Sequence, residues 1–292
     1  MRFGGHETFA IREGWLARGL ELLTTTPELL VDEFSEDHLG VGRNMAKAIR
    51  HWLVATGLAE STGSALIPTS FGTLIRKKDP HLMDRCTWWM LHINLVNNPE
   101  QAFAWNWFFN HWALPRFDRA PCSEGLRRFS ATRLPRAPSP KTLEREIAVF
   151  LQSYARPIPA RIDDPEDSSE SPLQELGLLY HYGASGYYQL NFESKPIPAA
   201  VFGYAIARSR GNADRSDFSI SELERGESAP GRCFLLRGDD LYDLILRYEE
   251  QHKKRFALRS QAGERGVRIA TALTPTEWAK EHYATAEAYN HA

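Results

Sequence analysis

The chain has 292 residues, of which 42% are hydrophobic and 25% are charged, values typical of a folded globular protein with one or two domains. Its formal net charge is −2 at pH 7, so the protein does not belong to the class of uniformly basic nucleic-acid-binding proteins. An anionic partner would have to bind a local basic patch. No apolar run reaches the about 20 residues that a membrane helix needs, and the three cysteines form no Cys-x-x-Cys pair. We therefore expect a cytoplasmic protein without a membrane span, zinc ribbon or disulfide framework.

The chain begins MRFGGHETFAIREGW, with two glycines directly before His6 and Glu7. Two interpretations are open for this segment. It is either a turn that anchors the terminus, with Phe9 and Trp15 packed inward and His6 capping the turn, or it is part of a functional site.

Residues 35–75 give the clearest local pattern. Apolar side chains at helical spacing predict a helix that starts after Gly42 and ends near Gly57; they are Met45, Ile49, Trp52 and Leu53. A short hairpin and a further helix follow this one. A helix, a glycine-containing turn, a second helix and a hairpin are the order of a winged helix-turn-helix, which we place at about residues 15–78.

The neighbouring face of the predicted second helix is basic, with Arg43, Lys47 and Arg50 in register and Asn44 beside them. In a helix-turn-helix this helix enters the major groove of DNA, so we expect these four residues to contact duplex DNA. The alternative is a packing or protein-interaction module whose basic residues are merely solvated.

Aromatic residues dominate residues 86–112, and the turn at Asn97-Asn98-Pro99 predicts two paired helices. We place the aromatic-rich helices at residues 84–156. Most of the rings are expected in the core, but five polar residues are embedded among them: His92, Asn94, Asn106, Asn110 and His111. A histidine on an apolar helix is more often a satisfied core residue than a ligand, and a shared polar site is the alternative.

Basic residues are concentrated between Arg116 and Arg145, where eight of them face three acids. We expect Arg127 and Arg128 in this run to contact DNA. The later segment DDPEDSSES is acidic and polar, without apolar periodicity, so it predicts a linker. The expected organisation is an N-terminal domain at 1–157, a linker at 158–172 and a C-terminal domain at 173–292.

The C-terminal part predicts a hairpin with Gly183 to Gly186 at its turn, a helix from about residue 196, and a Pro-Gly turn followed by a short strand. A long amphipathic helix comes next, with Leu241 and Tyr248 in its apolar stripe. A second winged-helix-like module and a plain helical packing domain are both open here. The predicted fold class is mainly α with small β-hairpins (α+β).

Common catalytic signatures are missing from the sequence, including the Gly-x-x-x-x-Gly-Lys-Ser/Thr loop, the Gly-x-Ser-x-Gly elbow and the His-Glu-x-x-His helix. Glu193 and Lys195 follow a predicted strand downstream of the acids Asp163, Asp164 and Glu166, a layout similar to a metal-dependent nuclease site. Because the spacing is loose and the acids lie in the predicted linker, a solvated strand end explains these residues better.

Several motifs in order resemble one bacterial family: GGHETFAIREGWL, LGVGRNMAKAIRHWL, TSFG, DPHLMDRCTWWMLHINL, FFNHW and KTLEREIAVFLQSY, followed by SPLQELGLL, YAIAR and SAPGRCFLL. This is the SspB-like DNA nickase family of DNA phosphorothioate modification and phage-defence systems, long described as a domain of unknown function. The resemblance spans nearly the whole chain. The chain departs from the family pattern at Met83, where an acid is expected, and at Glu146, where an aspartate is common.

The resemblance implies a DNA-binding endonuclease that nicks one strand so that sulfur can be incorporated. It implies double-stranded DNA, a cysteine desulfurase, an ATPase and a sulfurtransferase as partners. For the nicking reaction we expect Mg²⁺ or Mn²⁺ as cofactor, and a homodimer is one expected oligomeric state. The positions matching the family's polar residues are His6, Glu7, Arg12, Arg43, Asn44, Asp79, His92, Asn94 and Asn110. We take His6, Glu7, His92, Asn94 and Asn110 as candidate catalytic residues. A non-catalytic DNA-binding scaffold and a transcriptional regulator are the alternatives.

Overall fold

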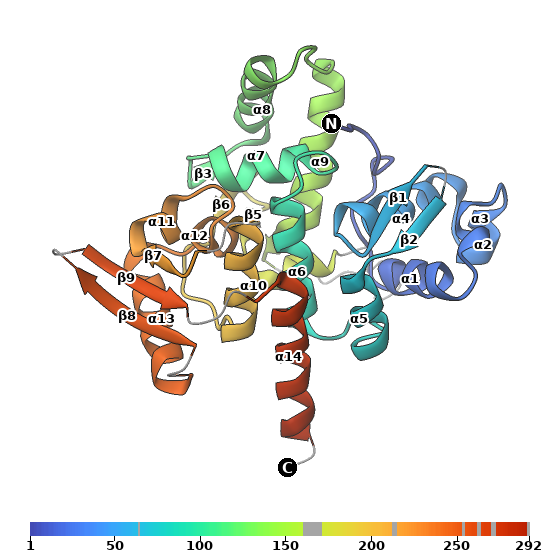
Figure 1. The fold of residues 1–292 in the computed structure, drawn as a ribbon. Helices are drawn as coiled ribbons and strands as arrows, with labels where there is room; N and C mark the ends of the chain where they lie inside the picture. Colours follow the sequence, from blue (N-terminus) through green and yellow to red (C-terminus); the bar gives the residue numbers. More distant parts are fainter. Residues whose placement is uncertain are drawn as a thin grey trace. The chain divides into compact units, whose positions relative to one another are not determined.

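The computed structural model describes residues 1–63, 65–159, 171–211, 215–252, 255–261, 264–269 and 273–290 (Figure 1). These residues form mainly helices, together with sheets of two, four and three strands, which confirms the predicted fold class. The chain divides into two compact units, Met1–Asn191 (unit 1) and Phe192–Ala292 (unit 2). Most of the expected linker at 158–172, including Asp163, Asp164 and Glu166, lies outside the described residues. The domain limits 1–157 and 173–292 therefore stay a prediction.

Unit 1 begins with a helical group and a hairpin. Its elements are α1 (Trp15–Thr25), α2 (Pro27–Val31), α3 (Ser35–Leu39), α4 (Arg43–Ala55), β1 (Ala59–Thr62), β2 (Ala65–Pro68) and α5 (Ser70–Lys78). Gly40 adopts a left-handed conformation (φ 65°) between α3 and α4, where a side chain would be strained. The α4 stripe Ile49, Trp52 and Leu53 is buried. The winged helix-turn-helix assignment of this group stays a prediction.

The TSFG segment shows why residues of these types start α5. The Thr69 hydroxyl accepts a hydrogen bond from the Gly72 amide at 2.9 Å and so caps the helix. A methyl group on Gly72 would lie 2.0 Å from the carbonyl oxygen of Leu58. Only glycine therefore lets α5 approach the end of the α4–β1 connection this closely.

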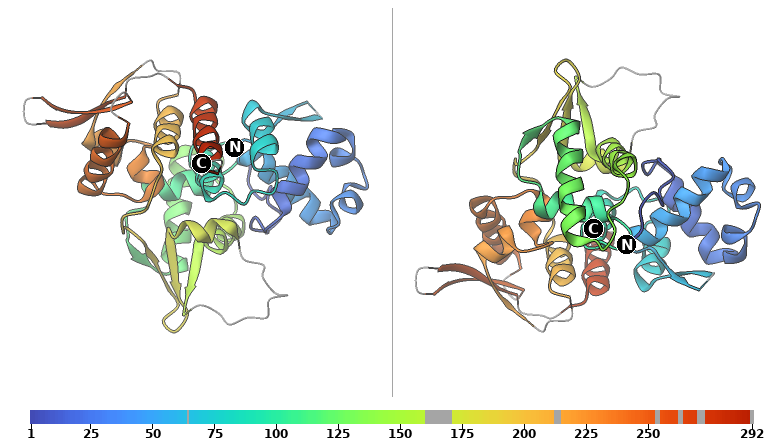
Figure 2. Two further views of the ribbon diagram at one scale, coloured as in Figure 1. Left: turned by 90° about the horizontal axis from the view of Figure 1, so that it is seen from below. Right: turned by 90° about the horizontal axis from the view of Figure 1, so that it is seen from above.

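The second part of unit 1 contains α6 (Arg85–Val96), α7 (Phe103–His111), α8 (Arg119–Arg133) and α9 (Pro140–Tyr154). The predicted pair of aromatic helices is present as α6 and α7. Phe108 and Phe150 lie 4.3 Å apart between ring centroids, which joins α7 to α9. The helices α8 and α9 run side by side (Figure 2), and Cys122 of α8 is completely buried.

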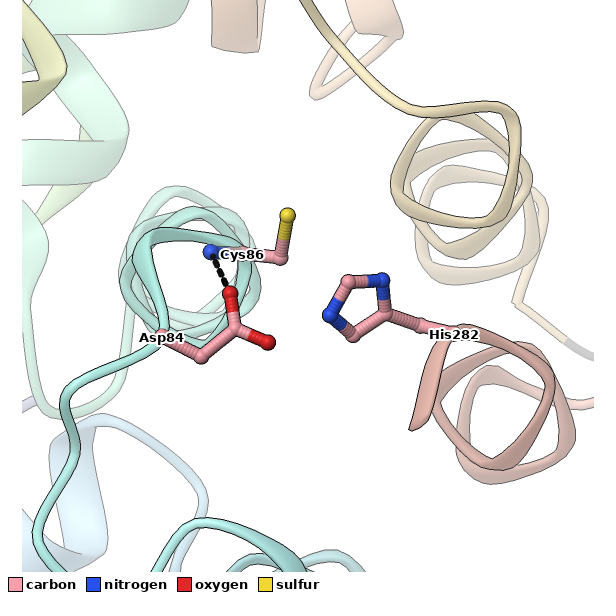
Figure 3. A group of neighbouring side chains, drawn as sticks. All are labelled: Asp84, Cys86 and His282. Atoms are coloured by element: carbon pink, nitrogen blue, oxygen red, sulfur yellow. Dashed lines mark hydrogen bonds between the residues drawn. The ribbon is translucent and has the colours of Figure 1, made fainter. Parts of the chain in front are cut away.

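A turn stabilised by two aspartates leads into α6. The Asp79 carboxylate accepts hydrogen bonds from the amides of Met83 (2.8 Å) and Asp84 (3.1 Å) and from the Thr87 hydroxyl (2.6 Å). Asp84 caps α6 by accepting from the Cys86 amide at 2.8 Å (Figure 3). Leu82 between them has a left-handed backbone (φ 52°), which this network holds in place.

A four-stranded sheet completes unit 1 with the order β3-β6-β5-β4. Its strands are β3 (Arg116–Phe117), β4 (Ala155–Ile158), β5 (Leu179–Tyr182) and β6 (Tyr187–Leu190), and the 3₁₀ helix η2 (Pro172–Leu176) precedes β5. The hairpin of β5 and β6 was predicted. The parallel pairing of β4 with β5 was not, because it joins segments on opposite sides of the expected linker.

Unit 2 is helical with one sheet. Its elements are α10 (Ala199–Ser209), β7 (Asp217–Ser219), α11 (Ile220–Arg225), α12 (Pro230–Phe234), α13 (Gly238–Gln251), β8 (Phe256–Gln261), β9 (Glu264–Ile269) and α14 (Pro275–Asn290). The expected short strand after the Pro-Gly turn is instead the helix α12, with Pro230 in its first turn. The predicted stripe of α13 is buried, and so is Cys233. None of the helices in the described part of the chain has the length and apolar character needed to cross a lipid bilayer.

Candidate nucleic-acid interface

The N-terminal segment forms a tight turn that separates His6 from Glu7. The Glu7 amide donates to the Gly4 carbonyl (3.0 Å), the Phe9 amide to the His6 carbonyl (2.8 Å), and the Thr8 amide to Nδ1 of His6 (3.1 Å). Glu7 and Thr8 both have positive φ angles, 48° and 68°, which non-glycine residues adopt at a cost of about 1–3 kcal/mol each. His6 is 2% exposed, whereas Glu7 is half-buried and Thr8 exposed.

His6 supports the interior of unit 1. Because its Nδ1 accepts from Thr8, the neutral ring carries its proton on Nε2, which lies 3.1 Å from Oε1 of Glu146. The same carboxylate oxygen accepts from the Gly4 amide at 2.6 Å. The His6 ring stacks on Trp52 of α4 with centroids 6.0 Å apart, and Trp105 of α7 lies at 6.1 Å. His6 thus joins the N-terminal turn, α4, α7 and α9.

A second histidine explains Gly5, whereas Gly4 has a positive φ angle of 70°. His51 of α4 is 3% exposed, and a methyl group on Gly5 would lie 2.4 Å from its Nδ1. Burial, with smaller contributions from His6 and Arg2, lowers the pKa of His51 to about 3. His51 is therefore a neutral side chain at physiological pH, packed directly beneath the N-terminal turn.

The polar residues of the aromatic helices are also buried. His92 is 0% exposed, and its Nδ1 lies 2.8 Å from the Tyr154 hydroxyl. The Asn94 amide donates to the Thr56 carbonyl at 2.8 Å, and the Asn110 amide donates to the Asn106 carbonyl at 2.9 Å. Each of the three side chains therefore has a partner in the protein interior, and a DNA duplex could not reach it from solvent without rearrangement of the helices.

The exposed face of α4 is smaller than the sequence suggested. Arg43, Asn44 and Lys47 are exposed, and Arg43 forms an ion pair with Glu36 at 3.0 Å. Arg50 is half-buried and donates to the Leu30 carbonyl (3.0 Å) and to the Ser35 hydroxyl (2.6 Å). Burial lowers the pKa of its guanidinium. Arg50 thus braces α4 against α2 and α3, which leaves the first two turns of α4 to face solvent.

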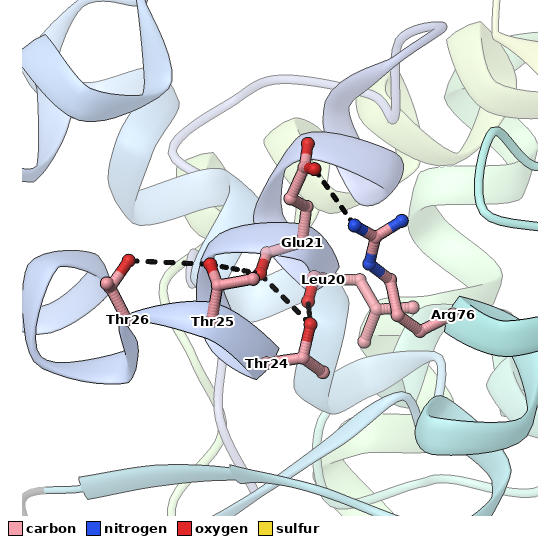
Figure 4. Close-up of polar contacts among 6 residues, drawn as sticks. All are labelled: Leu20, Glu21, Thr24, Thr25, Thr26 and Arg76. Atoms are coloured by element: carbon pink, nitrogen blue, oxygen red, sulfur yellow. Dashed lines mark hydrogen bonds and ion pairs between the residues drawn. The ribbon is translucent and has the colours of Figure 1, made fainter.

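The helices behind α4 hold this face in position. Arg76 of α5 forms an ion pair with Glu21 of α1 at 2.9 Å (Figure 4). At the end of α1, the hydroxyls of Thr24 and Thr25 donate back to the carbonyls one turn earlier (Figure 4). Because these hydroxyls donate to carbonyls of their own helix, the two threonines at the end of α1 already have hydrogen-bond acceptors within α1.

A second basic surface lies on α8, α9 and the segments that flank them. Its exposed residues are Arg116, Arg119, Arg127, Arg128, Arg133, Arg136, Lys141 and Arg145. Arg127 and Arg128 share the carboxylate of Glu124, with Nε–O distances of 2.6 and 2.8 Å, and their hydrogen bonds lower the pKa of Glu124 to about 2. One carboxylate cannot neutralise two guanidinium groups, so the triad keeps a net positive charge.

Two neighbours of the N-terminal turn, Arg2 and Glu146, were not among the candidate catalytic residues, although Glu146 lies in one of the family motifs. Arg2 is exposed, and its Nε would lie 3.0 Å from a methyl group on Gly5, so it adds positive charge beside the N-terminal turn. Glu146, buried beneath the same turn, is 140 residues from His6 in the sequence. Arg12, a family-motif position, lies over the rings of Phe9 (5.7 Å) and Trp15 (5.4 Å). It holds the end of the N-terminal segment against α1.

The comparisons with known proteins cover almost the whole chain. Residues 3–283 match a family model described as "Protein of unknown function (DUF4007)". A solved structure titled "SspB crystal structure" is 24% identical, with a TM-score of 0.81 over 99% of this chain and 96% of that chain. Another, titled "Magnesium ion-bound SspB crystal structure", is 24% identical, with a TM-score of 0.82 over 99% of this chain and 95% of that chain. Among curated proteins, none matches this chain. The likeness to the SspB structures shows a shared fold, and the family match shows that the chain belongs to the DUF4007 family.

Proposed function

We propose that the protein is a DNA-binding component of a DNA phosphorothioate modification and phage-defence system, and that it nicks one strand. The observation that carries this proposal is the SspB-like fold, which extends over 99% of the chain. Its expected partners in the cytoplasm are double-stranded DNA and the cysteine desulfurase, ATPase and sulfurtransferase that deliver sulfur. A homodimer is the oligomeric state to test first.

The proposed DNA contact uses the exposed start of α4 and the basic surface of α8 and α9. Arg43, Asn44 and Lys47 are exposed at the start of α4, which in the proposed helix-turn-helix would be the helix that reads the major groove. Arg127 and Arg128 carry the residual positive charge described above and suit contacts to backbone phosphates. Arg50 is left out of the DNA contact because its guanidinium is engaged inside unit 1.

For the chemistry, we propose that Glu7 faces the DNA and that the four buried candidates are positioning residues. Glu7 is half-buried and not fully enclosed, and the positive φ angles of Glu7 and Thr8 fix the backbone that carries it. Mg²⁺ commonly binds through one or two carboxylates and several waters, so the donor chemistry of Glu7 fits Mg²⁺ or Mn²⁺. Such an ion would neutralise phosphate charge and lower the pKa of a bound water. His6 fixes the turn from below, and His92, Asn94 and Asn110 hold the helices on which it rests.

Relaxation of a supercoiled plasmid in Mg²⁺ or Mn²⁺ tests the nicking proposal. We expect open circles from the wild-type protein, and a large loss of the nicking rate in Glu7→Gln. Glu13→Gln is the matched control, because it removes an exposed carboxylate from the same N-terminal segment. If the folded wild-type protein never produces open circles at any metal or salt concentration, the enzyme proposal is wrong.

A non-catalytic DNA-binding scaffold is the second candidate, and the burial of His6, His92, Asn94 and Asn110 favours it. It predicts salt-dependent DNA affinity that falls in Arg43→Gln and Lys47→Gln but not in Lys77→Gln on the exposed side of α5. It also predicts that Glu7→Gln leaves the activity of the assembled modification system intact. A transcriptional regulator would instead prefer one duplex sequence strongly over unrelated duplexes in the same titration.

A further inference from the structure

The four-stranded sheet of unit 1 turns one face to the surface. Alternate residues of a strand point to opposite faces, so the strand pairing fixes which side chains share a face. The inner face carries Phe117, Leu179 and Leu190, all of which are buried. The other face, which we call the tyrosine face, carries seven side chains that are half-buried or exposed: Arg116, Arg156, Ile158, Tyr180, Tyr182, Tyr187 and Gln189.

The side chains of the tyrosine face form two rows across the strands. In the order β4-β5-β6-β3, the first row is Arg156, Tyr180, Gln189 and Arg116, and the second row is Ile158, Tyr182 and Tyr187. Neighbouring strands lie about 4.8 Å apart, so the backbones of the two arginines are about 14 Å apart with Tyr180 between them. The second row lies next to the turn of the β5–β6 hairpin, whose tip projects from unit 1 (Figure 2).

Two of the three tyrosines stack on each other, and the third does not. The rings of Tyr182 and Tyr187 have centroids 4.7 Å apart, and the Arg116 guanidinium lies 3.4 Å from the centroid of the Tyr187 ring. The Tyr180 hydroxyl accepts a hydrogen bond from the Asn191 side-chain amide at 3.2 Å, which holds the tip of the ring. In the described part of the chain, no aromatic ring or cation stacks on Tyr180, so a planar ligand would meet no competing ring there.

The tyrosine face has a positive charge. Arg116 and Arg156 are exposed, and neither forms an ion pair with a residue that the structure describes. None of the seven side chains is acidic, and the nearest acid along the chain to Arg116 is the exposed Asp118, directly before α8. Two guanidinium groups and one carboxylate leave a net charge of +1. The turn from Gly183 to Gly186 adds only small uncharged side chains.

Rings and guanidinium groups in this arrangement match the chemistry of a single-stranded nucleic acid. The bases of a duplex stack on one another, whereas the bases of a single strand can stack on aromatic side chains. Four-stranded sheets in other nucleic-acid-binding proteins hold about two or three bases in this way. Guanidinium groups match phosphate oxygens with paired hydrogen bonds, so the arginines at the two ends of the first row suit the backbone on either side of the stacked bases.

We propose that the tyrosine face binds a short single-stranded stretch of DNA, whose bases stack on Tyr180 and Tyr182 and whose phosphates contact Arg116 and Arg156. The inference rests on the proposed function and adds the single-stranded part of the substrate to it. A nick leaves a strand end that can separate from its complement. In this role the tyrosine face holds that strand, while α4 and the basic surface of α8 and α9 hold the duplex. A protein with an acidic surface is the competing occupant.

The first test removes rings from the full-length chain. Tyr180→Leu and Tyr182→Leu change the tyrosine face, and Phe34→Leu, the matched control, removes an exposed ring between α2 and α3. Anisotropy measures affinity for a fluorescent single strand of about 12 thymidines, within the range of about 4–16 nucleotides that one single-strand-binding module covers, and for a duplex of the same length. We expect each of the two tyrosine variants to lose single-strand affinity about 5- to 100-fold and to keep its duplex affinity. Tyr182→Phe keeps the ring and should bind like the wild type, as should Phe34→Leu.

The second test concerns the phosphate contact and the place of the bound strand. Loss of one phosphate contact reduces the slope of log affinity against log salt by about 0.7 for a single strand. We expect this reduction in Arg156→Gln and not in Lys77→Gln, which removes a charge from an exposed position of α5. Ultraviolet cross-linking of a single strand that carries 5-iodouracil should attach it to a peptide that contains β5 or β6, and attachment only elsewhere would contradict the inference.

The two probes separate this inference from the proposed function. If the wild-type chain binds the duplex but not the single strand, or if Tyr180→Leu and Tyr182→Leu bind the single strand like Phe34→Leu, the inference is wrong while DNA binding by unit 1 stands. If the wild-type chain binds neither probe, the proposed function fails as well. If the tyrosine variants keep their single-strand affinity but lose the activity of the assembled modification system, the face binds a protein and the inference is overturned. Thermal melting of each variant verifies that unit 1 is folded.

Discussion

Replacement of His6 by alanine tests whether the N-terminal turn depends on a buried support. The substitution removes a ring that contacts Trp52 and Trp105 and leaves Glu146, which is 3% exposed, without its imidazole. Loss of the imidazole leaves a buried carboxylate oxygen with one partner fewer, at about 1–3 kcal/mol, and removes a ring from between two tryptophans, which adds a cavity cost of similar size; together we expect a loss of about 3–5 kcal/mol of unfolding free energy. Glu146→Gln keeps an acceptor for the Gly4 amide at this position, so we expect a smaller loss of about 1–2 kcal/mol.

The double variant His6→Ala/Glu146→Gln should be less destabilised than the sum of the single variants. Once Glu146 is an amide, loss of the imidazole no longer leaves a buried carboxylate without this neighbour, so we expect a coupling free energy of about 1–3 kcal/mol between the two contacting positions. Urea denaturation followed by tryptophan fluorescence measures these values, because seven of the eight tryptophans lie in unit 1. With a denaturant slope of about 2 kcal/mol per M, His6→Ala should lower the midpoint by about 1.5–2.5 M.

An unchanged midpoint in His6→Ala would refute this reasoning, because a residue that joins four elements cannot be removed without cost. If the midpoint is unchanged and plasmid nicking is lost, His6 belongs to the chemistry and not to the support. Lys77→Ala, a change at an exposed position of α5, is the control for the denaturation series.

Three further outcomes follow from the same packing. Burial lowers the pKa of His51 from 6.5 to about 3, so below pH 6.5 the unfolded chain binds a proton that the folded chain does not. The free energy of unfolding should therefore fall by about 1.4 kcal/mol per pH unit as the pH falls towards 5. Urea titrations at each pH should show a flatter slope in His51→Gln. Asp79→Asn should cost about 2–4 kcal/mol, since three donors lose a charged acceptor, and a melting temperature equal to that of the wild type would contradict this role. Gly72→Ala should cost at least about 1–3 kcal/mol through its clash with Leu58, whereas Thr73→Ala, on the exposed side of α5, should change the urea midpoint little.

Patterns within single elements predicted much of the fold. The spacing of Ile49, Trp52 and Leu53 located α4, and glycines marked both of its ends. The stripe of α13 and the paired aromatic helices α6 and α7 were predicted for the same reason, because a helix that buries one face repeats its apolar residues every three or four positions. Pairing between strands that are far apart in the sequence produces no local pattern of apolar residues, so β3 and the parallel pair of β4 and β5 were not predicted.

The candidate site was harder to predict because residue type does not reveal burial. His6, His92, Asn94 and Asn110 have side chains suited to catalysis, but the structure places all four in the interior. The helical spacing puts Arg50 on the same face as Arg43 and Lys47. Its guanidinium nevertheless turns inward, because it donates a hydrogen bond to the carbonyl of Leu30. Only the neighbours of α4 decide which of its basic residues face solvent, and these neighbours come from separate elements.

Each unit contains one thiol that is completely buried, Cys122 in unit 1 and Cys233 in unit 2. Burial raises the pKa of Cys122 to about 12 and also raises that of Cys233, so both are protonated and inert while their units are closed. A thiol reagent can reach them only through local or global opening. In a Cys86→Ser background, the modification rate at each position therefore measures how often the corresponding unit opens, with no cysteine added to the chain.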